Sequence, residues 1–270
     1  MTSKAAVGSE RAPGEAVVEQ VKEKYGEIAE GKRGGCCESE FPVCGAPVRH
    51  LALQSGETVL DLGSGRGLDA FLAAKAVGPS GRVTGVDMTP QMLERARANA
   101  RRGGYANDEF REGRLERLPV EDGSVDAVTS NCVVNLVPDK AAVFREIARV
   151  LEPGGRMVVS DVVLDGKLPE AVEKDLLAYV GCVAGAARRE SCFGLRAAGL
   201  GEVEVLRDVD SLMTWAEMAP AEARALSDRT GVSPAEVAGK VRSLTYRARK
   251  PATPGRYGHC SPHIWERPAL

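Results

Sequence analysis

Aromatic residues and histidines are scarce in this sequence: aromatic residues make up 4% of its 270 residues, and there are 3 histidines. So few aromatic rings leave little material for a surface on which nucleic-acid bases could stack. The charges nearly balance, with 36 basic and 38 acidic residues, so the chain has no general attraction to nucleic acid or to an anionic membrane surface. No apolar run approaches the roughly 20 residues needed to span a bilayer. The sequence therefore predicts neither a nucleic-acid nor a membrane partner.

The N-terminal stretch has little apolar character as well. Met1–Ala16 is rich in Gly, Ser, Ala, Glu and Pro and lacks the apolar core that a signal peptide contains. The 7 cysteines are therefore expected to be reduced thiols of a cytoplasmic protein, and their odd number argues against a complete disulfide framework. Some of these thiols are then available for chemical or ligand roles.

Short apolar runs alternate with helix-like stretches through the middle of the chain. We expect strands at 58–61, 82–87, 109–111, 124–130 and 156–161, and helices at 68–77, 89–100 and 139–151. Parallel strands need covering crossovers, so this alternation predicts an α/β fold with a doubly wound, Rossmann-like parallel sheet and helices on both faces. Further on, we expect helices at 169–183, 188–198 and 213–240 and strands at 201–206 and 241–249, which form a smaller C-terminal α+β portion.

These patterns give a predicted domain organisation. The expected parts are a flexible N-terminus at 1–20, an N-terminal helix and thiol-bearing segment at 21–50, a cofactor-binding Rossmann-like domain at 51–165, a C-terminal portion at 166–250 and a tail at 251–270.

The first predicted strand leads directly into a glycine loop, Asp61-Leu-Gly63-Ser-Gly65-Arg-Gly67. Small residues at alternate positions let a backbone turn sharply and approach a ligand closely. Asp87 ends the next strand, 20 residues after Gly67, where a carboxylate can accept both hydroxyl groups of a ribose. The spacing G-x-G-x-G favours S-adenosylmethionine over NAD, because S-adenosylmethionine has no pyrophosphate to seat on a helix N-terminus. A tight turn without a ligand and a site for another nucleotide are the alternatives.

Four motifs carry a resemblance to a known family. They are the stretches 59–65 (VLDLGSG), 85–90 (GVDMTP), 130–136 (SNCVVNL) and 179–185 (YVGCVAG). The first two are typical of class I methyltransferases in general, whereas the last two, which contain Cys132 and Cys182, resemble the bacterial arsenite methyltransferases. The resemblance runs from about Tyr25 to Pro251. It implies S-adenosylmethionine as methyl donor, As(III) as acceptor, arriving as a thiol conjugate, and a thiol reductant such as thioredoxin or glutathione.

The cysteines are candidate ligands for arsenic. As(III) is a soft centre that suits thiolate donors and commonly takes three of them. Cys132 follows the fourth predicted strand, at the carboxyl edge where ligands bind in open α/β sheets, and Cys182 reaches it only through the tertiary fold. The resemblance implies a third donor from the pair Cys36 and Cys37. Adjacent side chains on an extended segment point opposite ways, so which of the two binds stays open, and Cys44 is a spare thiol that could pass arsenic inward or form a transient disulfide.

The remaining predicted site residues surround the cofactor. Tyr25 resembles a family tyrosine near the cofactor, and Glu116 follows the third strand, where class I enzymes contact adenine. Asn131 and Asn135 flank Cys132, and either could orient the methionine carboxylate or hold the loop. The predicted cofactor-binding set is Tyr25, Asp61, Gly63, Ser64, Gly65, Gly67, Asp87, Met88, Glu116 and Asn131.

The chemistry expected from these residues is an in-line methyl transfer onto arsenic. The arsenic lone pair carries no proton, so no general base is needed, and no histidine or pair of carboxylates lies in the expected acceptor strands. Two alternatives share parts of the evidence. One is a class I methyltransferase of a quinone, sterol or phenol with structural cysteines, and the other is a metalloid-binding sensor without catalysis.

Overall fold

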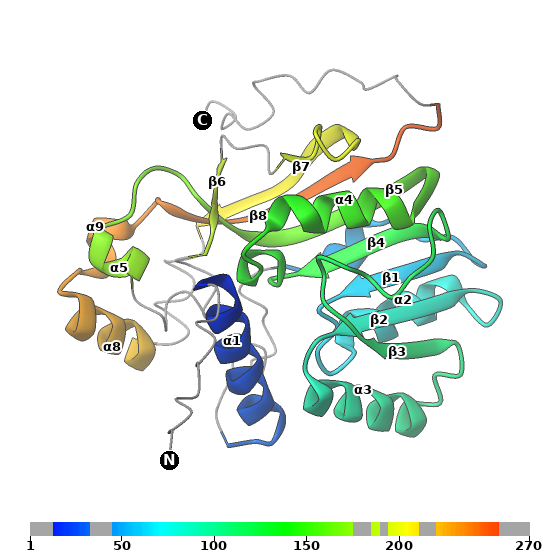
Figure 1. Cartoon of the computed structure of the whole chain (residues 1–270), viewed down its shortest axis with the longest axis horizontal. Coiled ribbons are helices and arrows are strands. Elements are labelled where there is room, and N and C mark those ends of the chain that lie inside the picture. The colour runs from blue at the N-terminus through cyan, green and yellow to red at the C-terminus, as the bar shows by residue number, and fades with distance from the viewer. Residues whose placement is uncertain (1–12, 33–44, 175–184, 190–193, 211–219, 254–270) are drawn as a thin grey trace, which may run out of the picture.

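The computed structural model of the chain describes residues 13–32, 45–174, 185–189, 194–210 and 220–253. They build a single eight-stranded sheet in the order β3-β2-β1-β4-β5-β8-β7, with β6 paired to β5 (Figure 1). The strands are β1 (Thr58–Leu62), β2 (Arg82–Asp87), β3 (Asp108–Glu112), β4 (Val125–Asn131), β5 (Leu151–Leu164), β6 (Ala187–Arg188), β7 (Gly201–Asp210) and β8 (Val241–Arg249). The predicted α/β fold class is confirmed.

The order of the parallel strands reverses in the middle of the sheet. From β1 the chain moves outward through β2 to β3, then returns to the other side of β1 and moves outward through β4 to β5. The carboxyl ends of β1 and β4 therefore lie side by side, while their following connections leave in opposite directions. In open α/β sheets such a reversal leaves a crevice in which ligands bind.

Helices cover both faces of the sheet. Successive side chains of β1 point to opposite faces, so they pack in two separate cores. Val59 packs with Ala73 of α2 (Leu68–Val77) and Leu93 of α3 (Pro90–Gly103). Leu60 packs on the opposite face with Phe144 of α4. The two layers thus fix β1, and with it the start of the glycine loop, from above and below.

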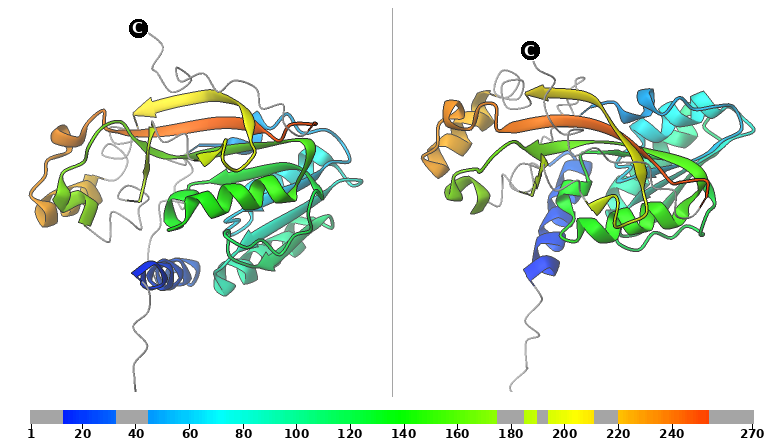
Figure 2. Two further views of the ribbon diagram at one scale, coloured as in Figure 1. Left: turned by 45° about the horizontal axis from the view of Figure 1, so that its top comes forward. Right: turned by 90° about the horizontal axis from the view of Figure 1, so that it is seen from above.

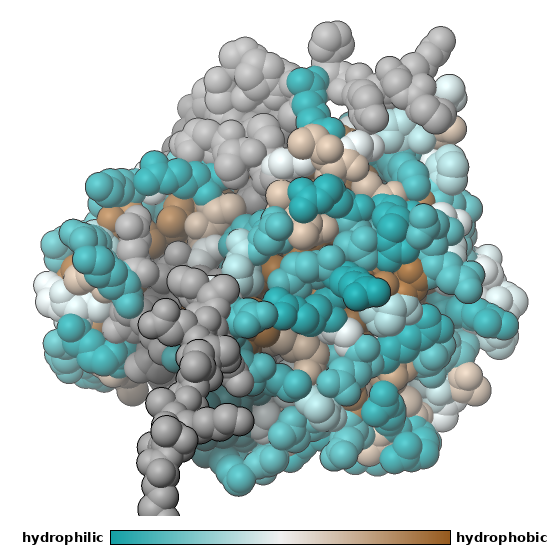
Figure 3. Space-filling view, in the orientation of Figure 1, coloured by the Kyte–Doolittle hydropathy of each residue, from teal (hydrophilic) through white to brown (hydrophobic). Residues whose placement is uncertain are grey.

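Helix α4 (Lys140–Val150) shows how the sequence sets one of these layers. The side chain of Asp139 accepts a hydrogen bond from the backbone N–H of Ala142, which caps the helix. Val143, Phe144 and Ile147 recur at helical spacing, so they form one apolar face that is fully buried against the sheet. On the face seen in Figure 3 the described surface is mainly hydrophilic, as expected when the apolar faces point inward.

The C-terminal part of the chain completes the same sheet. β8 runs antiparallel to β5 over nine residue pairs, from Arg156–Arg249 to Leu164–Val241, and β7 pairs antiparallel with β8. The chain between β5 and β8 contains α5 (Glu170–Lys174), α8 (Pro220–Thr230) and α9 (Pro234–Val237), which gather at one end of the sheet (Figures 1 and 2).

Helix α1 (Pro13–Ala29) lies off the edge of the sheet, outside both helical layers (Figure 2). Ile28 and Ala29 pack on Met92 of α3, and Val21 packs on Leu136. Leu136 belongs to η3 (Val134–Leu136), and a second short helix, η2 (Pro47–His50), precedes β1. No described helix is both long enough and apolar enough for a membrane crossing.

Three local predictions need correction. Residues 13–20, predicted as flexible, form the first half of α1, because Val18 and Val21 give it a buried apolar face. The α-helix predicted at 188–198 is absent from its described part: Arg188 ends β6, Arg189 and Gly194 have 3-10 geometry, and 195–199 form turns. The stretch 213–240 is less helical than predicted, since its described residues form only α8 and α9, separated by Gly231 in a left-handed conformation.

Candidate functional site

A cavity lies at the carboxyl ends of β1, β2 and β4, at the point where the strand order reverses, and α1 forms its outer wall. Seven of the predicted cofactor-binding residues line it: Tyr25, Gly63, Gly65, Asp87, Met88, Glu116 and Asn131. Asp61 of β1 and Ser64 and Gly67 of the glycine loop are not among the residues that line it. Cys132 lines the same cavity. The fold therefore brings the predicted cofactor loop and one of the predicted arsenic ligands to a single site.

The glycine loop is held by the strand next to it. The backbone N–H groups of Gly63 and Ser64 both donate to the carbonyl of Val86, over 2.8 and 3.1 Å. Gly63 has a φ of +64°, and a Cβ atom at this position would lie 2.5 Å from Cγ2 of Val133. Glycine is needed here for both reasons, since L residues rarely adopt that conformation and the space is filled. Gly63 thus links the cofactor loop to the residue that follows Cys132.

Asp87 is tied to the loop by both carboxylate oxygens. Its Oδ2 accepts from the backbone N–H of Gly65 over 3.0 Å, and its Oδ1 accepts from that of Thr89 over 2.8 Å. Burial raises the pKa of Asp87, while these hydrogen bonds act in the opposite direction. Each carboxylate oxygen keeps further acceptor capacity, so Asp87 can still receive the hydroxyl groups of a ribose from the cavity.

Asp61, near the end of β1, is a buried carboxylate close to two other acidic side chains. Its side chain is buried, and Oδ2 has no hydrogen-bond partner among the described residues. Burial, followed by the negative charges of Asp69 and Asp87, raises the pKa of Asp61 well above its ordinary value. A cluster of buried carboxylates with an open acceptor suits a cationic ligand. S-adenosylmethionine, which carries an ammonium and a sulfonium group, fits this requirement.

Asn131 connects the cofactor side to the segment that precedes β1. Its Nδ2 donates to Oδ2 of Asp69 over 3.1 Å and to the carbonyl of Gly45 over 3.0 Å, whereas its Oδ1 is buried and has no partner among the described residues. Gly45 packs directly on β5, because a Cβ atom there would lie 2.5 Å from Oγ of Ser160. The residue that immediately follows Cys44 in the chain is therefore fixed beside Asn131.

Cys132 directly follows β4 and has an unusual backbone. Its φ is +56°, a left-handed conformation that costs a non-glycine residue on the order of 1–3 kcal/mol and persists only where the surroundings enforce it. Its N–H donates to the carbonyl of Ser160 on β5 over 2.8 Å. Cys132 is disulfide-bonded, and its partner lies outside the described residues.

The other predicted thiols cannot be placed. Cys36, Cys37, Cys44 and Cys182 all lie outside the described residues. Within the described ranges no group of three or more His, Cys, Asp or Glu side chains is arranged to hold a metal ion. The structure decides one open alternative: Asn135 is buried, and its Nδ2 donates to the carbonyl of Val162 over 2.6 Å, so it holds the loop.

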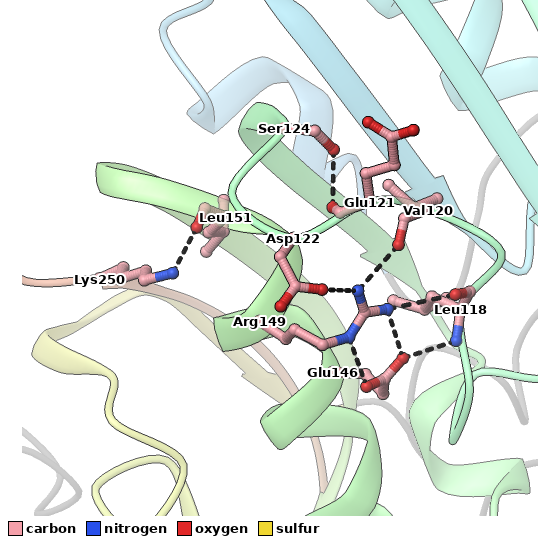
Figure 4. A network of polar contacts seen from close by, with 9 residues as sticks. All are labelled: Leu118, Val120, Glu121, Asp122, Ser124, Glu146, Arg149, Leu151 and Lys250. Carbon is pink, nitrogen blue, oxygen red and sulfur yellow. Dashed lines mark hydrogen bonds and ion pairs between the residues drawn. The ribbon is translucent and has the colours of Figure 1, made fainter.

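A polar network holds residues 118–122, the segment that follows the cavity-lining Leu115 and Glu116 (Figure 4). Arg149 of α4 donates to the carbonyls of Val120 and Leu118 over 2.8 and 3.2 Å and pairs with Asp122 and Glu146. The carboxylate of Glu146 in turn accepts from the N–H of Leu118 over 2.7 Å.

Sequence reasoning missed several residues of the site. Asp69 could have been suspected, since it stands in the first turn of the helix that follows the glycine loop. The cavity-lining face of α1, with Val18, Val21, Tyr25 and Ile28, has the helical spacing of an apolar stripe, which the residue composition of the N-terminus concealed. Gly45 and Val133 carry no local signal, because their roles depend on distant partners.

Comparisons with known proteins agree with this site. Residues 53–220 match a family described as "Methyltransferase domain". An arsenite methyltransferase from Halobacterium salinarum is 54% identical over 143 residues (53% of this chain and 37% of that protein). Another, from Aquipseudomonas alcaligenes, is 47% identical over 142 residues (50% and 41%). The match thus spans about two-fifths of the length of these relatives.

Solved structures agree as well. The crystal structure of CrArsM, an arsenic(III) S-adenosylmethionine methyltransferase from Chlamydomonas reinhardtii, has a TM-score of 0.61 and 36% identity, and the match covers 86% of this chain and 74% of that one. A geranyl diphosphate methyltransferase, at 23% identity and a TM-score of 0.61, shares the fold. The chain therefore belongs to the S-adenosylmethionine-dependent methyltransferases, in the family of the arsenic(III) methyltransferases.

Proposed function

We propose that the protein methylates arsenite: it transfers methyl groups from S-adenosylmethionine to trivalent arsenic bound by cysteine thiolates, and so serves arsenic detoxification. One observation carries this proposal. Cys132 lines the same cavity as Gly63, Gly65 and Asp87 of the cofactor side. A soft thiolate beside the methyl donor is suited to hold a soft acceptor such as As(III).

The described residues account for how the methyl donor would be held. Asp87 and the glycine loop suit the ribose, Leu115 and Glu116 suit the adenine, and the buried carboxylate of Asp61 suits the ammonium group. When bound, S-adenosylmethionine would supply an electrophilic methyl group: the arsenic lone pair would form the As–C bond as the S–CH3 bond breaks and S-adenosylhomocysteine leaves, and the thiol reductant would return the resulting As(V) to As(III) with two electrons. Holding the acceptor on the axis of that methyl group is the main contribution of the protein, and such positioning can be worth roughly 7–11 kcal/mol.

The arsenic site is proposed to consist of Cys132, Cys182 and a third sulfur from the N-terminal segment. Cys36 or Cys37 is the proposed third donor, and Cys44 is the spare thiol. Cys132 binds arsenic as a thiolate, so a disulfide at Cys132 must first accept two electrons from a dithiol such as reduced thioredoxin or from two glutathione molecules.

The protein's own groups also explain how the reaction could proceed without a base. The lone pair of arsenic carries no proton, so the buried carboxylates are free to bind cations and need not accept a proton. Val18, Val21 and Ile28 of α1 give the cavity an apolar outer wall, which limits the access of water to the methyl donor. We further propose that arsenic arrives as a thiol conjugate and that the protein works in the cytoplasm, where such thiols stay reduced.

Arsenic speciation by chromatography tests the proposal, using the full chain with S-adenosylmethionine, arsenite and a thiol reductant. We expect methylated arsenic from the native protein and at least a hundredfold less from Cys132→Ser and Cys182→Ser. Binding of S-adenosylhomocysteine should change less than threefold in both variants. Cys260→Ser, in the tail outside the predicted ligand set, is the matched control and should retain activity.

Two other outcomes would contradict the proposal. Full methylation activity of Cys132→Ser would show that Cys132 is not needed to bind arsenic, which would rule out the proposed thiol site. A native protein that binds S-adenosylhomocysteine but yields no methylated arsenic would favour a quinone, sterol or phenol acceptor, or, if it still binds arsenite, a sensor.

A further inference from the structure

The segment that follows Cys132 is fastened to β5 along its length. The N–H of Cys132 donates to the carbonyl of Ser160 over 2.8 Å. Three residues later, the N–H of Asn135 donates to Oδ2 of Asp161 over 3.0 Å, and its Nδ2 donates to the carbonyl of Val162 over 2.6 Å. Three consecutive residues of β5 thus hold both ends of one short turn, which we call the Cys132 turn (residues 132–135).

Asp161 is the only side chain of β5 among these contacts. It is buried, and its two oxygens accept from two different backbone N–H groups: Oδ2 from Asn135 and Oδ1 from Val162 over 2.9 Å. A carboxylate can accept at both oxygens at once, whereas an amide of the same shape can accept at only one. Burial raises the pKa of Asp161 to about 7, and the hydrogen bonds from Asn135 and Val162 oppose that rise.

A cation secures the far side of the turn. Nζ of Lys140, in the first turn of α4, donates to the carbonyls of Asn135 and Val137 over 3.3 and 3.1 Å. Its charge also acts on Asp161, whose pKa it lowers. Hydrogen bonds to β5 and to Lys140 of α4 therefore hold the turn. Neither Asp161 nor Lys140 lines the cavity.

The backbone conformation of Cys132 requires contacts of this kind. A φ of +56° at a residue other than glycine or asparagine is retained only where neighbouring contacts determine it. It also fixes the direction in which the side chain leaves the chain. The next residue, Val133, packs on Gly63, so the position of the Cys132 turn is coupled to the position of the cofactor loop.

We propose that Asp161 is a positioning residue: its carboxylate, by holding Asn135, keeps Cys132 in the conformation that presents its thiol to the cavity. Asp161 does not touch the reacting atoms. The inference deepens the proposed arsenite methylation and rests on it for its catalytic consequence, but the geometry of the Cys132 turn is independent of the acceptor.

The test is the reactivity of Cys132 in Asp161→Asn, a variant of the same shape that loses one acceptor. Native and variant proteins, both reduced, are treated with iodoacetamide, and the rate is read for the Cys132 peptide by mass spectrometry. We expect at least a tenfold change in this rate. We also expect at least a tenfold lower kcat for arsenite methylation, with KM for S-adenosylmethionine within threefold.

Val158→Ala is the matched control, because Val158 is a fully buried residue of the same strand that packs in the other core cluster, which contains no residue of the Cys132 turn. It should lower Tm, yet leave the labelling rate of Cys132 and kcat within threefold. This comparison separates positioning from loss of stability, since a purely structural Asp161 would behave like Val158.

The outcomes are distinct. A folded Asp161→Asn protein with native Cys132 labelling and native kcat would overturn the proposal. Where this variant does not fold, Asp161→Glu, which keeps both carboxylate acceptors but displaces them by one methylene group, should alter Cys132 labelling about threefold, and native labelling would overturn the proposal. If the native protein does not methylate arsenite, the proposed function fails, while the labelling rates still decide the role of Asp161.

Discussion

Two buried aspartates, Asp61 of β1 and Asp161 of β5, differ in how their carboxylate oxygens are bound. Asp61 and Asp161 are both 2% exposed, and burial raises the pKa of each. Oδ2 of Asp61 has no hydrogen-bond partner among the described residues, whereas both oxygens of Asp161 are bound by backbone N–H groups of the chain itself. The chain therefore leaves one acceptor of the first carboxylate open, whereas it uses the second carboxylate to hold its own backbone.

The difference extends to the regions around them. The cofactor side, near Asp61, is built mainly from neighbouring stretches of sequence, residues 61–89, which form one strand-loop-helix-strand unit. The thiol side, near Asp161, joins Gly45, Cys132 and Ser160, which are far apart in the chain. A site for a common cofactor can thus be formed mainly by one continuous stretch of sequence, whereas a site for a particular acceptor combines residues that are far apart in the chain.

The largest effect expected is on the pH dependence of stability at Asp161. Its pKa is about 7 in the folded protein against an ordinary value of 3.8, so the folded state binds this proton more tightly, and stability falls as pH rises from about 4 to about 7. Three pH units correspond to about 4 kcal/mol. Denaturant unfolding at pH 4 and pH 8 should show the free energy of unfolding of the native protein falling, relative to Asp161→Asn, by up to that amount. A constant difference would show that Asp161 does not titrate in this range.

Gly63→Ala should disturb both the cofactor side and the thiol side of the site. The added Cβ atom would meet Val133, and at a φ of +64° the backbone resists any L residue, so we expect about a hundredfold lower kcat/KM. Gly231→Ala is the control, because its φ of +69° carries the same strain while nothing lies within 4 Å. Equal losses of activity in the two variants would mean that strain, and not the contact with Val133, is responsible.

Asp61→Asn should affect the cofactor side alone. Loss of the charge should weaken binding of S-adenosylhomocysteine about tenfold by calorimetry, as expected for a hydrogen bond to a charged group. The ligand-free variant should be at least as stable at pH 8, because a buried charge is removed. Asp126→Asn is the control: Asp126 accepts from the N–H of Thr58 at the opposite end of β1, so the affinity should not change. Unchanged affinity in Asp61→Asn would show that this carboxylate does not receive the ligand.

The smallest effect is expected at Arg149, which supports the wall around Glu116 from a distance. Arg149→Met should lower Tm and weaken cofactor binding only about threefold, because the carbonyls of Leu118 and Val120 lose their donor. Arg145→Met, on the same helix, breaks only an exposed ion pair with Asp139 and should change neither quantity measurably. A tenfold loss of affinity in Arg149→Met would place this network closer to the ligand than the structure indicates.

The contrast between the two sides explains what could be predicted from the sequence. The glycine loop, Asp87 and the strands around them were predicted because periodicity and loop composition are local signals. Tyr25 and Glu116 were included through a family resemblance, and both line the cavity.

The remaining features depend on contacts that sequence spacing does not reveal. The role of Asn135 was left open because its partner, Val162, lies on another strand. The helix predicted at 188–198 fails because Arg188 pairs with Leu164 in a strand that becomes visible only once β5 is known to extend that far. The first half of the N-terminal helix, residues 13–20, was predicted as flexible because its composition conceals the apolar spacing of Val18 and Val21.

The antiparallel return of β8 has a consequence for how such proteins diversify. Because β8 pairs with β5 over nine residue pairs, the described residues between 165 and 240 add only β6 and the outermost strand β7 to the sheet. That interval can lengthen, shorten or be exchanged without disturbing the strands that carry the glycine loop. New acceptors can then be acquired by replacing one insertion, with the methyl-donor half inherited unchanged.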